Sequence, residues 1–321
     1  MIDHRLHVLR VVAELGTVTE AARRLGYTPS AVSHQLKSLS KDLGIAVVEP
    51  QGRGLRLTAA GSLLLERTQE LFTRWEEIRG EIAEAGTGAA PNSRILRLCG
   101  FSTAAATLLP PTVDAVRRRH PDSTVTIIEA GPEECFELLL ADQADVAVVV
   151  ATDPLPPRSD ARFEQDTLLS DRLDLLVPDG HPLACRASVS LSNAAEESWI
   201  VDRPGTPYHR LVRAACAAAG FAPEVAHLSH EWETGAALVS AGLGVSLIPR
   251  LARLPHGYAV HRVPLRGDPV PSRTILTGIR SGSSRQPLIA AALAGLQDIA
   301  ATLGQNGGDS RSSLPRVPTE E

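Results

Sequence analysis

Hydrogen-bond donors gather on one face of a helix that we expect over residues 29–43. The side chains of this face, none of them acidic, are Ser30, Ser33, His34, Lys37 and Lys41. Phosphate oxygens and many base-edge atoms accept hydrogen bonds, so such a face suits contact with a DNA groove. Polar outer faces are also ordinary on solvated helices, and the pattern alone favours that simpler interpretation. The neighbouring elements therefore have to decide between the two.

The same helix has an apolar back and a clear start. Its core stripe is expected to consist of Val32, Leu36, Leu39 and Leu43, at spacings of four, three and four. Thr28 suits the N-cap, and Pro29 suits the first helical position, where a missing N–H costs nothing. Two short helices are expected before it, over residues 6–15 and 17–25. This order within about forty residues indicates a helix-turn-helix.

A small β-hairpin is expected directly after this helix. Residues 45–48 would form its first strand, residues 51–54 a tight turn and residues 55–57 the returning strand. Arg53 at the tip and Arg56 at the side would then be well placed to contact phosphates. The hairpin adds a wing to the helix-turn-helix.

Residues 6–61 resemble the N-terminal domain of LysR-type transcriptional regulators. The resemblance is carried by Ala21-Ala22, Leu25, Ser30-Ala31-Val32-Ser33, Gln35-Leu36, Leu39, Leu43-Gly44, Leu57-Thr58 and Ala60-Gly61. It implies an all-α winged helix-turn-helix whose third helix enters the major groove of double-stranded DNA at an interrupted palindrome. The DNA contacts that it implies are Ser30, Ser33, His34, Gln35, Lys37 and Arg53, with Thr28 as a capping residue near the backbone.

Several positions depart from the family's pattern. This chain has Pro29 where glutamine is common, His34 where arginine is common and Ser40 where glutamate is common. Val48-Glu49-Pro50 stands where Phe-x-Arg is common. The replaced glutamine and arginines often touch DNA in the family. The departures therefore concern base preference and phosphate contact, and they leave the expected fold unchanged.

A coiled-coil seam is expected along one helix from Thr58 to about Ala85. Its apolar side chains, spaced by three and four, are Leu64, Leu71, Trp75, Ile78 and Ile82, with Thr68 at one seam position. A narrow seam on a long helix favours a partner helix, and the alternative is an amphipathic helix lying on its own domain. The resemblance implies that this helix dimerises, and both a homodimer and a homotetramer fit. Residues 86–93 are expected to be a flexible hinge.

From residue 94 onward the expected strands and helices alternate, which predicts parallel sheets covered by helices. The resemblance extends over this part through Leu109-Pro110-Pro111, His120-Pro121-Asp122, His181-Pro182-Leu183-Ala184 and Ala241-Gly242-Leu243-Gly244-Val245 with Pro249. It implies an α/β effector domain with two lobes, similar to a periplasmic binding protein, with a small-molecule effector in the cleft between the lobes. We expect this domain over residues 94–303 and a disordered tail over residues 304–321.

Small hydroxyl side chains and glycines follow several of the expected strands. Ligands of such sheets collect beyond the strand ends, where free helix N–H groups favour a compact anion such as a carboxylate. For any one position the alternative is simple helix capping. With the resemblance, the expected effector-binding residues are Ser102, Thr103, Gly131, Thr206 and Glu231.

Composition and charge fit this division. The 321 residues are 43% hydrophobic, enough for two or three cores. The net charge is −5, but residues 1–58 carry eight basic against five acidic side chains, so a basic head precedes an acidic body. No secretory signal or membrane span is expected, which predicts a cytoplasmic protein. The cysteines, Cys99, Cys135, Cys185 and Cys216, have no metal-ligand spacing, and neither metal nor cofactor is expected.

Three alternatives remain at this stage. An enzyme is disfavoured because the chain has no G-x-S-x-G elbow, P-loop or dinucleotide fingerprint. A thiol redox-sensing regulator of the same fold would need a reactive cysteine and a resolving one. A free-standing solute-binding module does not explain the basic head. We therefore expect a DNA-binding transcriptional regulator that responds to a small molecule, with RNA polymerase as a further candidate partner.

Overall fold

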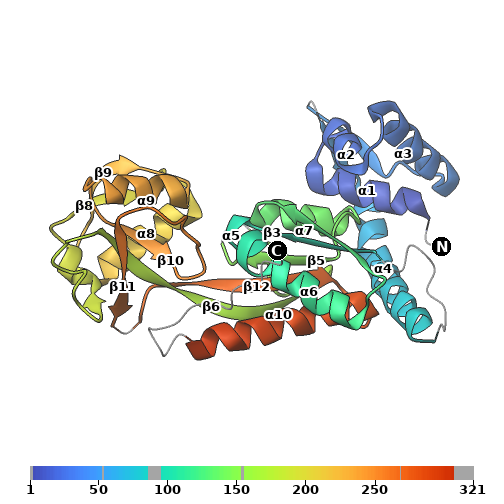
Figure 1. Ribbon diagram of the computed structural model, residues 1–321. Helices are drawn as coiled ribbons and strands as arrows, with labels where there is room; N and C mark the ends of the chain where they lie inside the picture. Colours follow the sequence, from blue (N-terminus) through green and yellow to red (C-terminus); the bar gives the residue numbers. More distant parts are fainter. Residues whose placement is uncertain (1–2, 53, 86–94, 153–154, 268, 307–321) are drawn as a thin grey trace.

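The computed structural model describes residues 3–52, 54–85, 95–152, 155–267 and 269–306. They form a small head, a long linker helix and a two-lobed body (Figure 1). The head consists of α1 (His4–Leu15), α2 (Val18–Leu25), α3 (Pro29–Leu43), β1 (Val48–Gln51) and β2 (Gly54–Leu57), and the linker helix is α4 (Ala59–Ala85). Arg53 and the hinge expected at residues 86–93 lie outside the described residues.

Side-chain caps fix the starts of the head's second and third helices. Thr17 Oγ1 accepts a hydrogen bond from the Glu20 N–H at 3.2 Å, and Thr28 Oγ1 accepts one from the Ala31 N–H at 3.2 Å. α3 ends at Gly44, whose φ of +69° favours glycine. The helix-turn-helix prediction therefore matches the structure at both ends of α3.

The returning strand of the hairpin predicted over residues 55–57 is present as β2, but its first strand lies further along the chain than expected. β1 pairs antiparallel with β2 from Val48↔Leu57 to Gln51↔Gly54, so the strand predicted over residues 45–48 is wrong. Gln51 and Gly54 form the last pair with only residues 52 and 53 between them, which agrees with the tight turn predicted over residues 51–54. Val47 lies outside the ladder, and its side chain is buried in the head's core.

The body alternates strands and helices. The first lobe contains β3 (Ile95–Gly100), α5 (Ser102–Thr107), α6 (Leu109–Arg119), β4 (Thr124–Glu129), α7 (Pro132–Leu140) and β5 (Val146–Val150). The second lobe contains β7 (Val189–Ser190), a short 3-10 helix (Leu191–Ala194), β8 (Ser198–Val201), α8 (Pro207–Ala218), β9 (Glu224–Leu228), α9 (Trp232–Ser240), β10 (Ser246–Pro249) and β11 (Val260–Arg266). The body is completed by β6 (Phe163–Pro178), β12 (Ser272–Arg280) and α10 (Pro287–Asn306).

A mixed sheet runs through both lobes along β6 and β12 (Figure 1). Its strand order is β4-β3-β5-β12-β6-β11-β7, and β10 also pairs with β6. β4, β3 and β5 are parallel, whereas β12 is antiparallel to both β5 and β6. The first half of β6 pairs with β12, and its second half pairs with β10 and β11. β6 therefore extends from one lobe into the other.

The predicted parallel pairing is present as β4-β3-β5 and β8-β9. The prediction missed β11, the first half of β6 and the antiparallel pairing of β12. β11 contains Pro264, which removes a backbone donor, and charged Arg262 and Arg266, so its sequence does not resemble a buried strand. The first half of β6 is mostly polar and partly exposed, which hides its strand pattern.

By length and composition α10 is apolar enough to cross a membrane, with a mean hydropathy of 1.4 over Pro287–Gly304. This differs from our expectation that no segment approaches a membrane span. Several of its side chains pack into the core of the first lobe: Leu288, Ile289, Ala292 and Leu296. A core helix passes the same test, so α10 is weak evidence for a span. The helix also continues to Asn306, beyond the end expected at residue 303.

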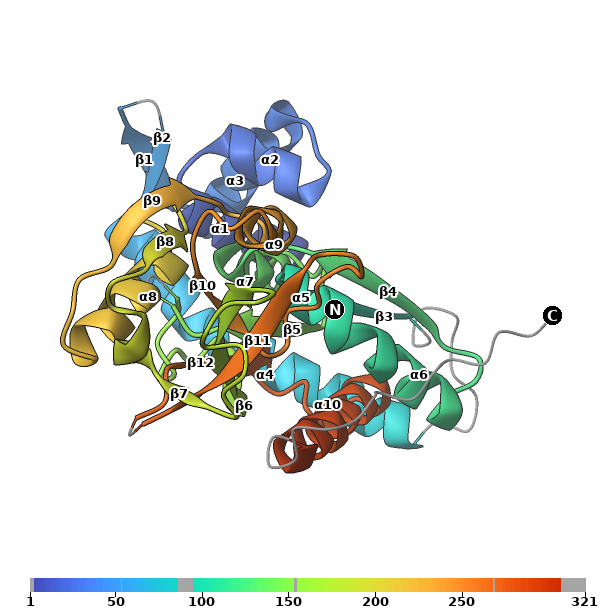
Figure 2. The same cartoon turned by 60° about the vertical axis from the view of Figure 1, so that its left-hand side comes forward.

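The head packs against the first lobe, and both views place it beside α7 and α4 (Figures 1 and 2). Arg24 of α2 is buried and forms ion pairs with Glu134, at 3.4 Å, and with Glu137 of α7. Arg10 Nη2 of α1 donates a hydrogen bond to the Leu140 carbonyl oxygen at 2.9 Å. Polar and charged contacts therefore hold the head on the first lobe. They involve α7, whose N-cap is Gly131, one of the predicted effector-binding residues.

A buried charge network joins the linker helix to the first lobe. Asp145 accepts hydrogen bonds from Arg97 Nη2 at 2.9 Å and from Arg280 Nη2 at 3.0 Å. Arg280 Nε also lies 3.5 Å from a carboxylate oxygen of Glu76 in α4. Burial acts to raise the pKa of Asp145, but Arg97 and Arg280 outweigh it, and the pKa is lowered overall. Asp145 therefore stabilises the fold in its ionised form.

We expect Asp145→Asn to lower the free energy of unfolding by about 3 kcal/mol at neutral pH, because two arginines lose their shared carboxylate. A folded-state pKa below the unfolded value gives stability that is present above the unfolded pKa, about 4, and lost as the pH falls through the folded pKa. Urea unfolding at neutral pH and at about pH 3 measures both effects.

Asp114→Asn, on the exposed surface of α6, is the matched control and should change the free energy of unfolding by less than about 0.5 kcal/mol. Equal losses in the two variants, or a loss at Asp145 that does not shrink in acid, would contradict the role of Asp145.

Candidate functional site

The outer face of α3 presents the predicted DNA contacts to solvent. Ser30, His34 and Lys37 are exposed, and Ser33 and Gln35 are half-buried. The other side of α3 packs against α1 and α2 through buried Val32, Leu36 and Leu39. The structure therefore brings these predicted residues together on one helix, with the donors outside and most of the apolar stripe inside. The prediction was wrong for Leu43, which is 48% exposed at the end of the helix.

Thr28 is both a cap and a neighbour of this face. Its Oγ1 accepts the hydrogen bond from the Ala31 N–H and lies 3.0 Å from Ser30 Oγ. Asp42, close to the same helix's end, is ion-paired with Arg5 of α1. In the wing, Arg56 lies 2.6 Å from Glu49, one of the residues that depart from the family pattern. The pair partly neutralises the wing, while Lys37 and Lys41 leave the α3 face basic.

The linker helix α4 has two distinct faces. Thr68, Glu76 and Gly80 are buried against their own chain, and the Thr68 hydroxyl donates to the Leu64 carbonyl at 2.8 Å. Thr68 is therefore covered by its own chain, although it has the seam spacing. Leu71, one turn beyond Thr68, is 55% exposed, and Ile82, two heptads beyond Thr68, is 63% exposed. The remaining predicted seam residues are half-buried: Leu64, Trp75 and Ile78.

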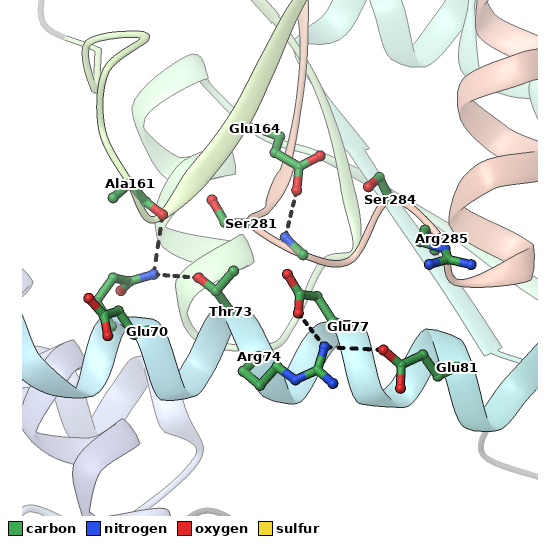
Figure 3. A pocket seen from close by; sticks show the side chains of 12 residues that line it. Glu70, Thr73, Arg74, Glu77, Glu81, Ala161, Glu164, Ser281, Ser284 and Arg285 are labelled. Carbon is green, nitrogen blue, oxygen red and sulfur yellow. Dashed lines mark hydrogen bonds and ion pairs between the residues drawn. The ribbon is translucent and has the colours of Figure 1, made fainter.

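A groove of about 690 Å³ lies between α4 and the first lobe (Figure 3). Its lining is mainly charged and polar, and three of the charged side chains on its α4 side are paired with one another. Arg74 lies 2.7 Å from Glu77 and 3.1 Å from Glu81, and the Glu164 side chain accepts from the Gly282 N–H. The groove is an interface between linker helix and lobe, and none of the predicted effector-binding residues lines it.

The predicted effector-binding residues lie at the starts of helices in both lobes. Gly131, Thr206 and Glu231 are the N-caps of α7, α8 and α9, and Ser102 begins α5. Thr206 Oγ1 caps its own helix by accepting from the His209 N–H at 3.1 Å. Simple capping thus accounts for Thr206 as well as ligand binding does. Glu231 is exposed, and no capping hydrogen bond comes from its side chain.

Thr103 and Trp232 connect the two lobes directly. The Trp232 indole N–H donates to Thr103 Oγ1 at 3.3 Å, and Thr103 is buried. The Trp232 ring lies edge-on to Tyr208 of α8, with the ring centroids 4.8 Å apart. The structure therefore brings Thr103 together with the starts of α8 and α9, although the contact uses Trp232 rather than the predicted Glu231.

A buried charged pair lies in the same junction and was not predicted from the sequence. Arg273 at the start of β12 donates from Nε to Asp171 Oδ2 of β6 at 3.0 Å. Its guanidinium carbon lies 5.0 Å from the centre of the Phe101 ring and 5.9 Å from the centre of the Trp232 ring. Burial raises the pKa of Asp171, and Arg273 opposes that shift. The available signal was an arginine beside an apolar strand, which is too common to single it out.

Three of the four cysteines, Cys99, Cys135 and Cys216, are buried. Cys99 and Cys135 come together in the core of the first lobe, where Cys99 Sγ lies 3.9 Å from the Cys135 carbonyl oxygen. The pKa of Cys99 is raised by its hydrogen bond with Cys135 and by burial, and burial raises the pKa of Cys216 to about 11. Reactive thiols need the opposite shift. Cys185 is the one cysteine that is exposed.

Comparisons with known proteins agree with this architecture. The family profile "LysR substrate binding domain" matches residues 89–301, and "Bacterial regulatory helix-turn-helix protein, lysR family" matches residues 4–62. The uncharacterised HTH-type transcriptional regulator YybE of Bacillus subtilis is 27% identical over 250 residues, which cover 78% of this chain and 83% of its own. The small neutral protease regulatory protein of Streptomyces coelicolor is 29% identical over 278 residues, 84% of each chain.

Solved structures show the same fold. A full-length OxyR variant from Pseudomonas aeruginosa matches with a TM-score of 0.63 and 22% identity, covering 91% of this chain and 96% of its own. CbnR, a LysR family transcriptional regulator, matches with a TM-score of 0.54 and 24% identity, covering 92% and 100%. At these identities the likeness supports the fold alone.

A winged helix-turn-helix joined to a two-lobed effector domain defines a ligand-responsive transcriptional regulator. The chain belongs to the LysR family. It is therefore a DNA-binding transcriptional regulator modulated by a small molecule and not an enzyme, as the sequence predicted.

Lys37→Ala should weaken DNA binding and lower the slope of log affinity against log salt by about one unit, because one phosphate contact is lost. Fluorescence anisotropy on operator DNA over a series of salt concentrations measures both. Arg118→Ala, an exposed arginine of α6 in the body, removes the same charge and should leave the slope unchanged. An unchanged slope for Lys37→Ala would remove this face from the DNA interface.

The native protein should react rapidly with one equivalent of the thiol reagent DTNB, at Cys185, because the other thiols are buried. Cys185→Ser should abolish the rapid phase, and urea should release all four thiols of the chain. Rapid native reaction of a second cysteine, with altered DNA binding, would revive the thiol-sensor alternative.

Proposed function

We propose that this regulator acts as a homodimer, or as a pair of such dimers, whose two α3 helices contact the half-sites of an interrupted palindrome. The single observation that carries the proposal is the exposed donor face of α3 on a head whose apolar stripe is buried. In this proposal residues 1–58 bind DNA, residues 59–85 dimerise, residues 86–93 are a hinge and residues 94–303 bind the effector. The protein works in the cytoplasm, and RNA polymerase is a candidate further partner.

DNA contact is assigned to Ser30, Ser33, His34, Gln35, Lys37 and Arg53, with Thr28 orienting the start of α3. Short hydroxyl and amide donors suit base edges, whereas Lys37 and Arg53 suit phosphates. Docking of the head on the first lobe uses Arg24 and Arg10, which belong to α2 and α1. The α3 face is therefore available to DNA while the head stays docked.

Dimerisation is assigned to Leu64, Leu71, Trp75, Ile78 and Ile82 of α4. The argument rests on the exposure of Leu71 and Ile82, which follow the heptad spacing on the side of the helix facing away from the chain's own lobe. Leaving such side chains in water is unfavourable by about 25 cal/mol per Å² of apolar surface. A second copy of the helix covers the same patch by two-fold symmetry, which matches a palindromic site.

The effector is proposed to be a small anion that binds in the junction between the lobes, near Ser102, Thr103, Gly131, Thr206 and Glu231. Support comes from the helix N-termini that these residues begin or precede, since free N–H groups and helix dipoles favour anions. The contact between Thr103 and Trp232 places elements of both lobes at this junction, so a ligand there can change how the lobes are held together.

The test is fluorescence anisotropy with DNA from just upstream of the coding region, with excess competitor DNA, comparing the native protein with Ile82→Glu. The native protein should bind tightly and form a dimer or larger assembly in analytical ultracentrifugation. Ile82→Glu should be monomeric and lose at least about tenfold in operator affinity, because a buried carboxylate opposes helix pairing and two linked heads are needed.

Leu243→Glu is the control, since Leu243 is a similarly exposed apolar side chain in the second lobe. It should change neither assembly nor DNA binding. A native-like assembly of Ile82→Glu would remove this face from the dimer interface, and absence of specific DNA binding by the dimeric native protein would oppose the proposed palindrome near its own coding region.

A further inference from the structure

Arg273 occupies a special place in the fold. It lies at the start of β12, opposite Asp171 of β6 in the strand register, where the two strands pass between the lobes. Its side chain is only 7% exposed, and it faces Phe101 of the first lobe and Trp232 of the second. One guanidinium therefore contacts structural elements that belong to both lobes.

The hydrogen bonds of Arg273 are incomplete. Nε donates to Asp171 at 3.0 Å, but Nη2 is buried and has no hydrogen-bond partner. In the described residues the other buried side-chain nitrogens of this kind are single Nε groups, those of Arg10, Arg24 and Arg280. Nη2 carries two N–H donors, and burying unpaired donors of a cation is costly. A ligand group that accepts one or both of these hydrogen bonds is therefore strongly favoured beside Arg273 Nη2.

The surroundings of Nη2 define the chemistry of that group. Phe101 and Trp232 lie against the guanidinium, and the ring of Tyr208 packs edge-on to Trp232. Asp171 remains beside Arg273 and already neutralises one charge. Asp174 and Asp202 are held by Arg250 at 2.9 Å and by His230 at 3.1 Å. The positive charge of Arg262 also acts on Asp171 and adds to that of Arg273. A single negative charge on an apolar body therefore fits these neighbours better than a dianion, whose second charge would increase the repulsion by the carboxylate of Asp171.

We infer that Arg273 is the specificity-determining residue of the effector site, and that the effector is a monocarboxylate with an apolar, preferably flat body. Its carboxylate accepts from Arg273 Nη2, and its body lies against Phe101, Trp232 and Tyr208. Entry requires the Trp232 indole to leave Thr103 Oγ1, which opens the contact between the lobes. The inference rests on the proposed effector site and deepens it by naming the ligand class.

The experiment uses the full chain with sodium benzoate and sodium hexanoate as probes at constant ionic strength. Benzamide is the neutral counterpart of benzoate, and inorganic phosphate is the competing anion. Tryptophan fluorescence reports the movement of Trp232, and Trp232→Phe identifies its part in the signal, since Trp75 and Trp199 also emit. The thermal midpoint gives an independent measure, because a ligand that binds only the folded state raises it.

Both carboxylates should give saturable changes with a Kd of about 1 mM or tighter, benzoate more tightly than hexanoate. Benzamide and phosphate should bind at least about tenfold more weakly, because neither offers a single carboxylate to the guanidinium. Arg273→Gln should lose at least about tenfold in benzoate affinity. Arg273→Lys keeps a charge beside Asp171, preserves folding and should lose affinity too, because lysine lacks the second donor group.

Arg250→Gln is the matched control: it also breaks an ion pair with a β6 aspartate, and it should keep benzoate affinity within about twofold. No saturable response to either carboxylate, equal binding of benzamide or phosphate, or native-like binding by both Arg273 variants would overturn the inference. Operator binding is measured on the same preparations. Intact operator binding without a carboxylate response defeats this inference alone, whereas a carboxylate response without operator binding defeats the proposed DNA-binding role.

Discussion

The buried ion pairs at the two ends of β12 are the constraint on which the body, linker helix and effector junction depend. At the first end, Arg273 is held by Asp171 of β6 at 3.0 Å between the lobes. At the other end, Arg280 is shared between Asp145, at 3.0 Å, and Glu76 of the linker helix, at 3.5 Å. Charges removed from water are costly unless they are paired. The register of β12 against β6 and the position of α4 therefore have to allow both sets of ion pairs to form at once.

This arrangement gives β12 a role that its sequence position does not suggest. The strand is hydrogen-bonded to β5 on one side and to β6 on the other, so it moves as a part of the sheet rather than by itself. One of its ends lies in the junction between the lobes, where we propose that the effector binds, and the other contacts the linker helix. A second connection runs through α7, which begins at Gly131 and holds Arg24 of the head through Glu134 and Glu137. Effector junction and DNA-binding head are thus joined by contiguous packed elements.

The parts that the sequence predicted are those in which local chemistry decides. Thr28 and Pro29 start α3 by capping and ring geometry, and the stripe from Val32 to Leu39 buries itself by helical period alone. Tertiary pairing decides the rest. Arg273 matters because the fold brings Asp171 opposite it from about a hundred residues away, and Trp232 because it meets Thr103 of the other lobe. Thr68 has seam spacing but is buried by its own chain, whereas Ile82, two heptads further on the same stripe, is exposed, since spacing along a helix does not show what packs against each turn.

Thermodynamic reciprocity limits how such a molecule can signal. A ligand shifts the conformation only by the difference between its affinities for the two states. Contact with Arg273 alone, equal in both states, would not change DNA binding. The contact between Trp232 and Thr103 supplies such a difference, because the ligand replaces a bond that exists only when the lobes meet there. If the effector changes the affinity for DNA by a given factor, DNA must change the affinity for the effector by the same factor.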